Sequence, residues 1–153
     1  MLIDFATSDV SVLTLVSAHV GQVHVPSPVF DEVAQIDEAL ASSLGLKLVE
    51  PTLEMLVEAG AARGRLSFQD RICVLVAKAG TFTCVSNDRR LRAECETEGV
   101  PVLWGLELLV ELVGVRALPP EAARDIASQI VSANKRMDPS VLARFLAKIG
   151  VKE

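Results

Sequence analysis

The sequence predicts an α/β fold of three layers, in which helices cover both faces of a mostly parallel central sheet of about five strands. Short β-branched, apolar runs alternate along the chain with segments whose apolar residues recur at helical spacing. The clearest example is residues 66–104, which read as helix, strand, helix and strand. A helix that links two consecutive strands makes these strands parallel, so the alternation indicates a parallel sheet.

The first strand is expected at residues 1–5, MLIDF, an apolar run that Asp4 interrupts. Because α/β sheets bind ligands at the carboxyl ends of their strands, Asp4 is a candidate functional residue. We interpret Asp9 as the cap of the helix that follows. The second strand is expected at residues 22–26, QVHVP, with His24 as an ordinary strand residue.

Ser27 and Pro28 have the residue types of a helix start, and the predicted helix carries Asp31 and Glu32 in its first turns. Acidic residues there interact favourably with the helix dipole, which is a sufficient explanation for one of the two. The third strand is expected at residues 46–51, LKLVEP.

Pro51 and Thr52 are then expected to start a helix in the segment TLEMLVEAGAARG, and Gly60 and Gly64 indicate that it ends in a loose loop that carries Arg63 and Arg65. The next helix is expected over residues 67–79, where apolar residues share one face. Ser67 followed by Asp70 matches the capping pattern S-x-x-D, and Gly80 ends this helix. Asp70 therefore has a structural explanation as well as a possible functional one.

A buried strand is expected at residues 81–85, TFTCV. Either Asn87 or Asp88 caps the following helix, which Gly99 ends. The last strand is expected at residues 100–104, VPVLW. The two strands and their helix form a βαβ unit, so they are predicted to be parallel.

The C-terminal part of the chain is predicted to be helical. Amphipathic helices are expected over residues 105–114, 121–137 and 140–150. We predict a single domain, residues 1–153, with a core at residues 1–118 and a helical extension at residues 119–153. For the extension, an interface role and a role in covering the flank of the sheet are equally good interpretations.

The composition favours a globular protein and argues against a membrane protein, a secreted protein and a protein that binds nucleic acid through a large positive charge. Half of the residues are hydrophobic, no apolar run reaches membrane-spanning length, and the start lacks a basic segment, so we expect a globular cytoplasmic protein. Three cysteines without C-x-x-C spacing are expected as small core residues. The net charge of −5 argues against nucleic-acid binding through bulk positive potential. It is compatible with a metal-dependent nuclease, because carboxylates that hold cations contribute to it.

Four acidic residues reach one edge of the predicted sheet: Asp4, Glu32, Asp70 and Asp88. Carboxylates brought together repel one another, and a divalent cation offsets that repulsion. Oxygen ligands favour Mg²⁺ or Mn²⁺, which activate water for attack on phosphorus. Because the sequence has no G-x-S-x-G motif, glycine-rich phosphate loop or histidine near a nucleophile, it favours phosphodiester hydrolysis.

Several segments occur in an order that resembles PIN domains, in particular the small prokaryotic toxins of VapBC-like toxin–antitoxin pairs. These segments are MLID, VPSPVFDEV, LSFQD, TFTCVSNDRRLR and EGVPVLWG. The resemblance implies an endoribonuclease whose catalytic and metal-binding residues are Asp4, Glu32, Asp70 and Asp88, with Mg²⁺ or Mn²⁺ as cofactor. Ser86 takes a position usually held by Ser or Thr near the metal. The implied partners are an RNA substrate, a second copy in a homodimer and an antitoxin protein, without a membrane.

Arginines near the acidic residues are candidate contacts for RNA phosphate. Arg71 and Arg89 directly follow two of the acids, and the others are Arg63, Arg65 and Arg90. The alternative function is a catalytically silent PIN-fold module that binds a protein or RNA. Phe5 and Ala6 favour it, because the family usually has small hydroxyl or amide residues there. An unrelated phosphoryl-handling α/β domain would need a lysine at a strand end, which the sequence does not offer.

Overall fold

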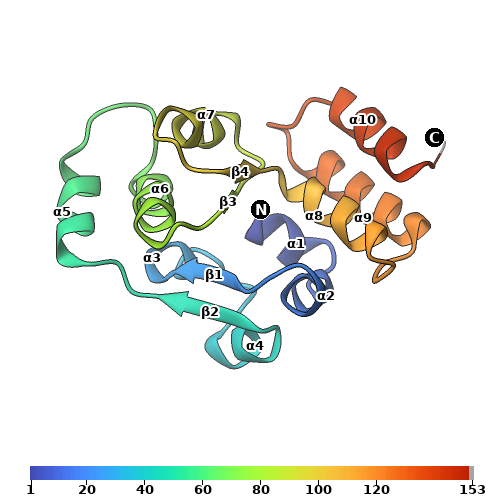
Figure 1. Cartoon of the computed structure of the whole chain (residues 1–153), viewed down its shortest axis with the longest axis horizontal. Coiled ribbons are helices and arrows are strands. Elements are labelled where there is room, and N and C mark those ends of the chain that lie inside the picture. Colours follow the sequence, from blue (N-terminus) through green and yellow to red (C-terminus); the bar gives the residue numbers. More distant parts are fainter. Residues whose placement is uncertain (152–153) are drawn as a thin grey trace.

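The computed structural model describes residues 1–151, which contain ten helices and four short strands. Figure 1 shows their arrangement. In chain order the elements are α1 (Leu2–Thr7), α2 (Ser11–His19), β1 (Val23–Pro26), α3 (Ser27–Phe30), α4 (Glu38–Ser43), β2 (Leu46–Val49), α5 (Leu53–Ala61), α6 (Phe68–Gly80), β3 (Cys84–Val85), α7 (Arg89–Thr97), β4 (Val102–Leu103), α8 (Gly105–Gly114), α9 (Pro120–Ala133) and α10 (Ser140–Ile149).

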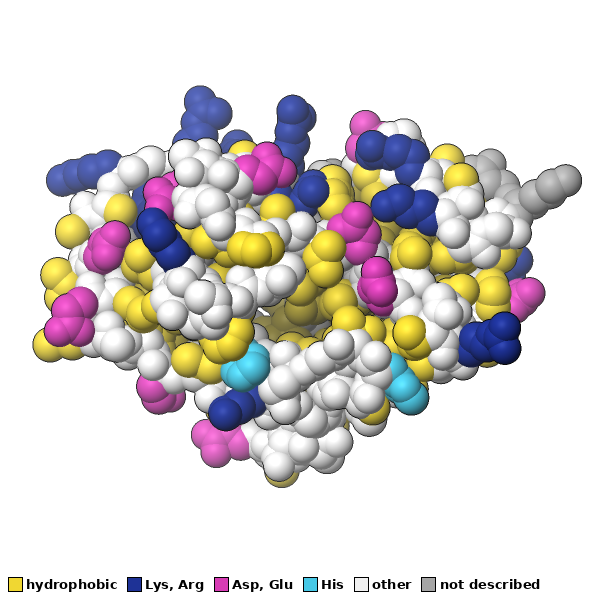
Figure 2. All heavy atoms as spheres, viewed as in Figure 1, with side chains coloured by type: hydrophobic (Ala, Val, Ile, Leu, Met, Phe, Trp, Pro, Cys, Tyr) yellow, Lys and Arg dark blue, Asp and Glu magenta, His cyan; other side chains and the backbone are white. Residues whose placement is uncertain are grey.

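The predicted three-layer fold with a central sheet of about five strands is wrong. Strands β1 and β2 pair in parallel, with Val23 opposite Leu46, and β3 and β4 pair in parallel, with Cys84 opposite Val102. Within residues 1–151 these are two separate two-stranded sheets. The prediction of parallel pairing is confirmed for both pairs. Figure 2 shows a hollow with hydrophobic side chains at the centre of the face where, in Figure 1, the two sheets approach each other.

The first predicted strand is instead helix α1. Leu2 and Phe5, three residues apart, are buried on one face of this helix, whereas Ile3 between them is 48% exposed. A run of five apolar residues fits a strand or one helical turn equally well, and here the period of three fits the core. Asp4 therefore lies in the first turn of a helix and not at the end of a strand.

The longer predicted helices are confirmed, together with their caps. Helix α6 follows Ser67, whose hydroxyl accepts a hydrogen bond from the amide of Asp70 at 3.1 Å. It ends at Gly80, and Thr81 then adopts the left-handed conformation at φ 53°. Asp88 caps α7 between β3 and β4, as the βαβ pattern predicts.

Two helix ends differ from the prediction. Helix α3 has only four residues and ends at Phe30, so Glu32 lies in the turn beyond it and not in the first turns of a longer helix. Helix α9 ends at Ala133, where a helix was predicted to continue to residue 137. Residues 134–139 thus form a linker between α9 and α10.

The largest core cluster joins the N-terminal helices to the C-terminal ones. It includes Phe5 and Leu13 from α1 and α2, Leu109 from α8, Ile130 from α9 and Phe145 from α10. This packing brings the α9–α10 linker beside α1 and the β3–α7 turn. No helix among residues 1–151 combines the length and the apolar character that crossing a membrane requires.

Candidate functional site

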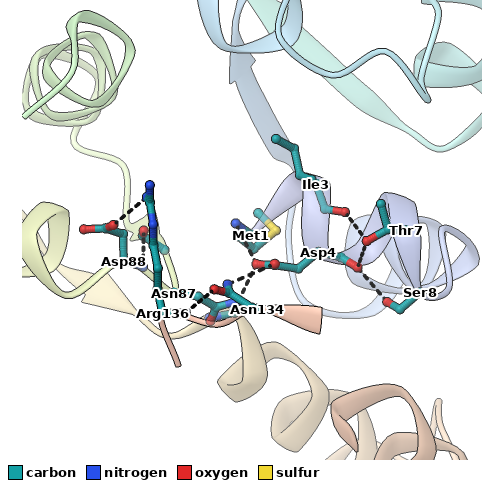
Figure 3. Close-up of polar contacts among 11 residues, drawn as sticks. Met1, Ile3, Asp4, Thr7, Ser8, Asn87, Asp88, Asn134 and Arg136 are labelled. Atoms are coloured by element: carbon teal, nitrogen blue, oxygen red, sulfur yellow. Dashed lines mark hydrogen bonds and ion pairs between the residues drawn. The ribbon is translucent and has the colours of Figure 1, made fainter. Parts of the chain in front are cut away.

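Asp4 lies at the centre of the candidate site, where its carboxylate meets groups from two distant parts of the chain (Figure 3). Its Oδ2 accepts a hydrogen bond from Nδ2 of Asn87 at 2.8 Å, and its Oδ1 accepts one from Nδ2 of Asn134 at 3.2 Å. The amino group of Met1 lies 3.2 Å from Oδ2. With 14% of its side chain exposed, Asp4 is a largely enclosed carboxylate whose two oxygens both have partners.

Asn87 holds Asp4 in place from the β3–α7 turn. Its side chain is 6% exposed and is bonded at both ends, because its Oδ1 also accepts a hydrogen bond from the amide of Gly105 at 2.8 Å. A Cβ atom at position 105 would lie 2.8 Å from Nδ2 and 2.9 Å from Oδ1 of Asn87. A glycine at the start of α8 is therefore a steric requirement of the site.

Asp88 combines a helix cap through one carboxylate oxygen with an ion pair through the other. Its Oδ1 accepts hydrogen bonds from the amides of Arg90 at 2.8 Å and Leu91 at 3.1 Å, which makes it the N-cap of α7. Its Oδ2 lies 3.6 Å from Nη1 of Arg136. The buried Ser86 accepts a hydrogen bond from the amide of Asp88 at 3.0 Å and so fixes the backbone before the cap.

Asp70 and Glu32 both affect the thiol of Cys73, a residue of α6. Burial raises the pKa of Cys73 to about 12, and the Asp70 carboxylate adds to that increase. Glu32 raises the same pKa by a smaller amount, while the amino group of Met1, the ion-pair partner of Asp4, lowers it. No hydrogen bond or ion pair within residues 1–151 joins Asp70 or Glu32 to Asp4 or Asp88, so the structure does not bring the four predicted acids together.

The four predicted carboxylates do not form a metal-binding site in the structure. They are those of Asp4, Glu32, Asp70 and Asp88. Among residues 1–151, no three His, Cys, Asp or Glu side chains are grouped closely enough to hold an ion. Asp4 has both oxygens occupied, Asp88 uses one oxygen as a helix cap, and Glu32 is exposed. In this arrangement the residues do not fit Mg²⁺ or Mn²⁺, and Asp4 and Asp88 are connected through Asn87, which donates to the first and directly precedes the second.

The two predicted arginine contacts differ in their surroundings. Nη1 of Arg71 donates to the carbonyl oxygens of Ala59, at 3.3 Å, and Ala62, at the C-terminal end of α5. This guanidinium satisfies helix carbonyls that otherwise lack partners. Arg89, the first residue of α7, is exposed beside Asp88 and is free to meet a ligand.

Three contact residues of the site were not predicted: Asn87 as a partner of Asp4, together with Asn134 and Arg136. For Asn87 the sequence signal was present, since a polar residue stands between Ser86 and Asp88 after a buried strand, but it was interpreted only as a possible cap. Asn134 and Arg136 were placed inside a predicted helix. The poor helix propensity of Asn134 is the one signal that marks the true helix end.

No protein-family model matches this sequence, and comparisons with curated proteins and with solved structures find no match.

Proposed function

We propose that the chain is a divalent-metal-dependent endoribonuclease of the toxin type, in line with its resemblance to PIN domains. One observation carries the proposal: Asn87 donates a hydrogen bond to Asp4 and directly precedes Asp88, so one turn connects two acids that are distant in the sequence (Figure 3). Because the carboxylates as arranged do not fit an ion, we assign no reaction step to a metal.

Basic side chains beside the site support an RNA substrate. Figure 2 shows Lys and Arg side chains along the edge of the molecule that carries α7, the α5–α6 loop and the α9–α10 linker. Arg63 and Arg65 in the loop, and Arg89 and Arg90 at the start of α7, are all exposed. Arginines in this arrangement suit the phosphates of an RNA backbone, in spite of the net charge of −5.

The test is cleavage of a panel of RNAs in Mg²⁺ or Mn²⁺ by the wild type and by Asp88→Asn. Asparagine caps helices as well as aspartate does, so this variant keeps α7 intact and removes only the charge. We expect Asp88→Asn to lower the cleavage rate on the order of a hundredfold. Substitution of a residue that only supports a metal ligand typically costs about 10- to 100-fold in activity, and this loss is at the upper end of that range.

The matched control is Asp37→Asn, since Asp37 caps α4 through a hydrogen bond from the amide of Leu40 at 2.7 Å. This variant changes the same residue type in the same structural role, away from Asp4. It should keep the activity of the wild type. Equal activity in wild type and Asp88→Asn would show that the proposed site is not responsible for cleavage.

The second candidate function is a catalytically silent module that binds RNA or a protein. The hydrogen bonds from Asn87 and Asn134 to the Asp4 carboxylate favour it, because both oxygens already have a partner within the chain. RNA binding that persists without Mg²⁺ or Mn²⁺, with no cleavage of any substrate, would support this function over the first.

The resemblance also supports proposals about partners and location. We propose a homodimer in the cytoplasm, and an antitoxin protein that covers or enters the site. Size-exclusion chromatography with light scattering measures the first of these directly, since a homodimer has twice the mass of 16.4 kDa.

A further inference from the structure

A cavity of about 190 Å³ lies between α8 and α10, two helices that run side by side in Figure 1 and contact each other. Trp104, the one tryptophan of the chain, lines this cavity. Its apolar walls come from Leu106, Val110, Val141 and Phe145. Sites for small organic ligands typically measure about 300–1,000 Å³, so this cavity has the size for a single ring system or side chain.

Trp104 is held in a fixed orientation from two sides. Its backbone amide donates to Oε2 of Glu107 at 2.8 Å, and Cζ of Arg92 on α7 lies 3.8 Å from the centroid of its ring. A guanidinium over a ring face is attracted by the ring quadrupole. Arg92 is not one of the residues that line the cavity, so Trp104 meets the cavity away from the guanidinium. The cavity therefore has an aromatic surface that is organised before a ligand binds.

The rim of the cavity has more positive than negative charge. Arg144 and Lys148 line it from α10, where both are exposed and, four residues apart, share one face of the helix. Nζ of Lys148 lies 3.3 Å from Oε1 of Glu107, the one acid among the described residues of the lining. Within residues 1–151 no ion pair involves Arg144. Apolar walls with a basic rim suit an anion that has a flat apolar part.

The cavity lies beside the candidate site, because both of its helices start from segments that contact the site. Trp104 directly precedes Gly105, whose amide donates to Oδ1 of Asn87, the partner of Asp4. The segment that leads into α10 contains Asn134, which also donates to Asp4. A nucleic-acid strand bound at Asp4 would thus have the cavity next to it.

We propose that this cavity is a subsite for one unpaired base of single-stranded RNA. The base stacks on Trp104 between the apolar walls, and Arg144 and Lys148 bind the phosphates on either side of it. Proteins that bind single strands combine aromatic stacking with basic grooves in this way. A whole amphipathic helix is too large for a cavity of this volume. The inference rests on the RNA substrate of the proposed function, but it involves no metal ion.

The first arm of the test varies the ligand and uses the fluorescence of Trp104, which is unambiguous because the chain has one tryptophan. Single-stranded oligoadenylate, titrated into the full chain in the presence of EDTA, should quench this fluorescence. An abasic oligomer with the same number of phosphates is the matched control. It should bind roughly tenfold more weakly without quenching, because it lacks the stacking contribution of the base. Double-stranded RNA, whose bases remain stacked in the helix, should not quench.

The second arm varies the protein. Val110→Phe fills the cavity from a partly buried position and should abolish quenching and weaken oligoadenylate binding roughly tenfold. Arg144→Ala, at an exposed position that the fold does not need, should weaken binding roughly threefold. Its matched control is Arg124→Ala on α9, which removes an arginine that pairs with Asp125 and does not line the cavity. This control should bind and quench like the wild type.

The outcomes separate this subsite from the ribonuclease proposal. Equal affinity for oligoadenylate and the abasic oligomer, or unchanged affinity in Val110→Phe and Arg144→Ala, overturns the subsite whether or not the chain cleaves RNA. Quenching by oligoadenylate without cleavage of any RNA supports the subsite and counts only against the nuclease activity. Quenching by an acidic amphipathic peptide but not by RNA overturns the subsite and assigns the cavity to a protein partner.

Discussion

Asn87 has hydrogen bonds at both ends of a side chain that is almost completely buried. It donates to Asp4 and accepts from Gly105, and so it joins α1 to the start of α8 through the β3–α7 turn. A buried amide that loses its partners incurs the full cost of desolvation, which makes this residue sensitive to substitution. Its position also explains why the backbone at Gly105 has no room for a side chain.

We expect Asn87→Ala to lower the free energy of unfolding by about 1–3 kcal/mol, because the Asp4 carboxylate and the Gly105 amide both lose a partner. Urea denaturation followed by the fluorescence of Trp104 measures this change. Asn134→Ala removes a bond to the same carboxylate from a more exposed position and should lower stability by less than about 1 kcal/mol. A similar loss in both variants would mean that burial of Asn87 contributes nothing.

The cysteines give a pH dependence of stability with a defined sign. Burial raises the pKa of Cys73 from 9.0 to about 12, and burial also raises the pKa values of Cys84 and Cys95. Above about pH 9 the unfolded chain loses thiol protons that the folded chain keeps. The folded state then binds more protons than the unfolded state, so stability is fully present below about pH 9 and decreases as pH rises toward 12.

This decrease should appear as a fall in the urea midpoint between about pH 8 and about pH 11. In Cys73→Ser the fall should be smaller, because one of the groups that titrate only in the unfolded chain is gone. A midpoint with the same pH slope in wild type and variant would contradict the raised pKa of Cys73.

Whether an element could be predicted from the sequence depends on how many residues carry its pattern. Helix α6 repeats its apolar face over several turns and has a cap at Ser67, so pattern and cap agree. The first five residues contain too few positions to separate a period of two from a period of three, and tertiary packing of Leu2 and Phe5 selects the helix. Helix α3 ends at Phe30 without a glycine or proline that marks the end.

Arg71 directly follows the predicted site residue Asp70, but its side chain has a structural role at the end of α5. Its guanidinium binds the carbonyls of Ala59 and Ala62, so we expect Arg71→Ala to loosen the C-terminal turn of α5 and to cost about 1–2 kcal/mol. Hydrogen exchange of residues 59–65 should become faster. Arg63→Ala, which changes an exposed arginine of the adjacent loop, should leave this exchange unchanged. Weaker RNA binding by Arg71→Ala with normal exchange in α5 would instead favour the phosphate contact expected from the sequence.

For the whole molecule, the sequence predicted parallel strand pairs and a helical C-terminal part but not how these parts pack. The two strand pairs remain separate sheets, and α8, α9 and α10 share a core with α1 and α2. The meeting of Asp4 with Asn134 depends on that packing, and no local pattern encodes it. Of the four predicted acids, Asp4 and Asp88 are connected through Asn87, which donates to Asp4 and directly precedes Asp88. Glu32 lies outside because α3 is short.

The central proposal is that the chain is a divalent-metal-dependent ribonuclease whose acidic residues include Asp4 and Asp88. Paramagnetic broadening of backbone amide signals by substoichiometric Mn²⁺ tests it most directly. We expect the amides of Asp4, Asn87, Asp88 and Asn134 to broaden first in the wild type, and this selective broadening to disappear in Asp88→Asn. Broadening that begins at acidic residues elsewhere on the surface, or that persists unchanged in Asp88→Asn, would contradict the claim.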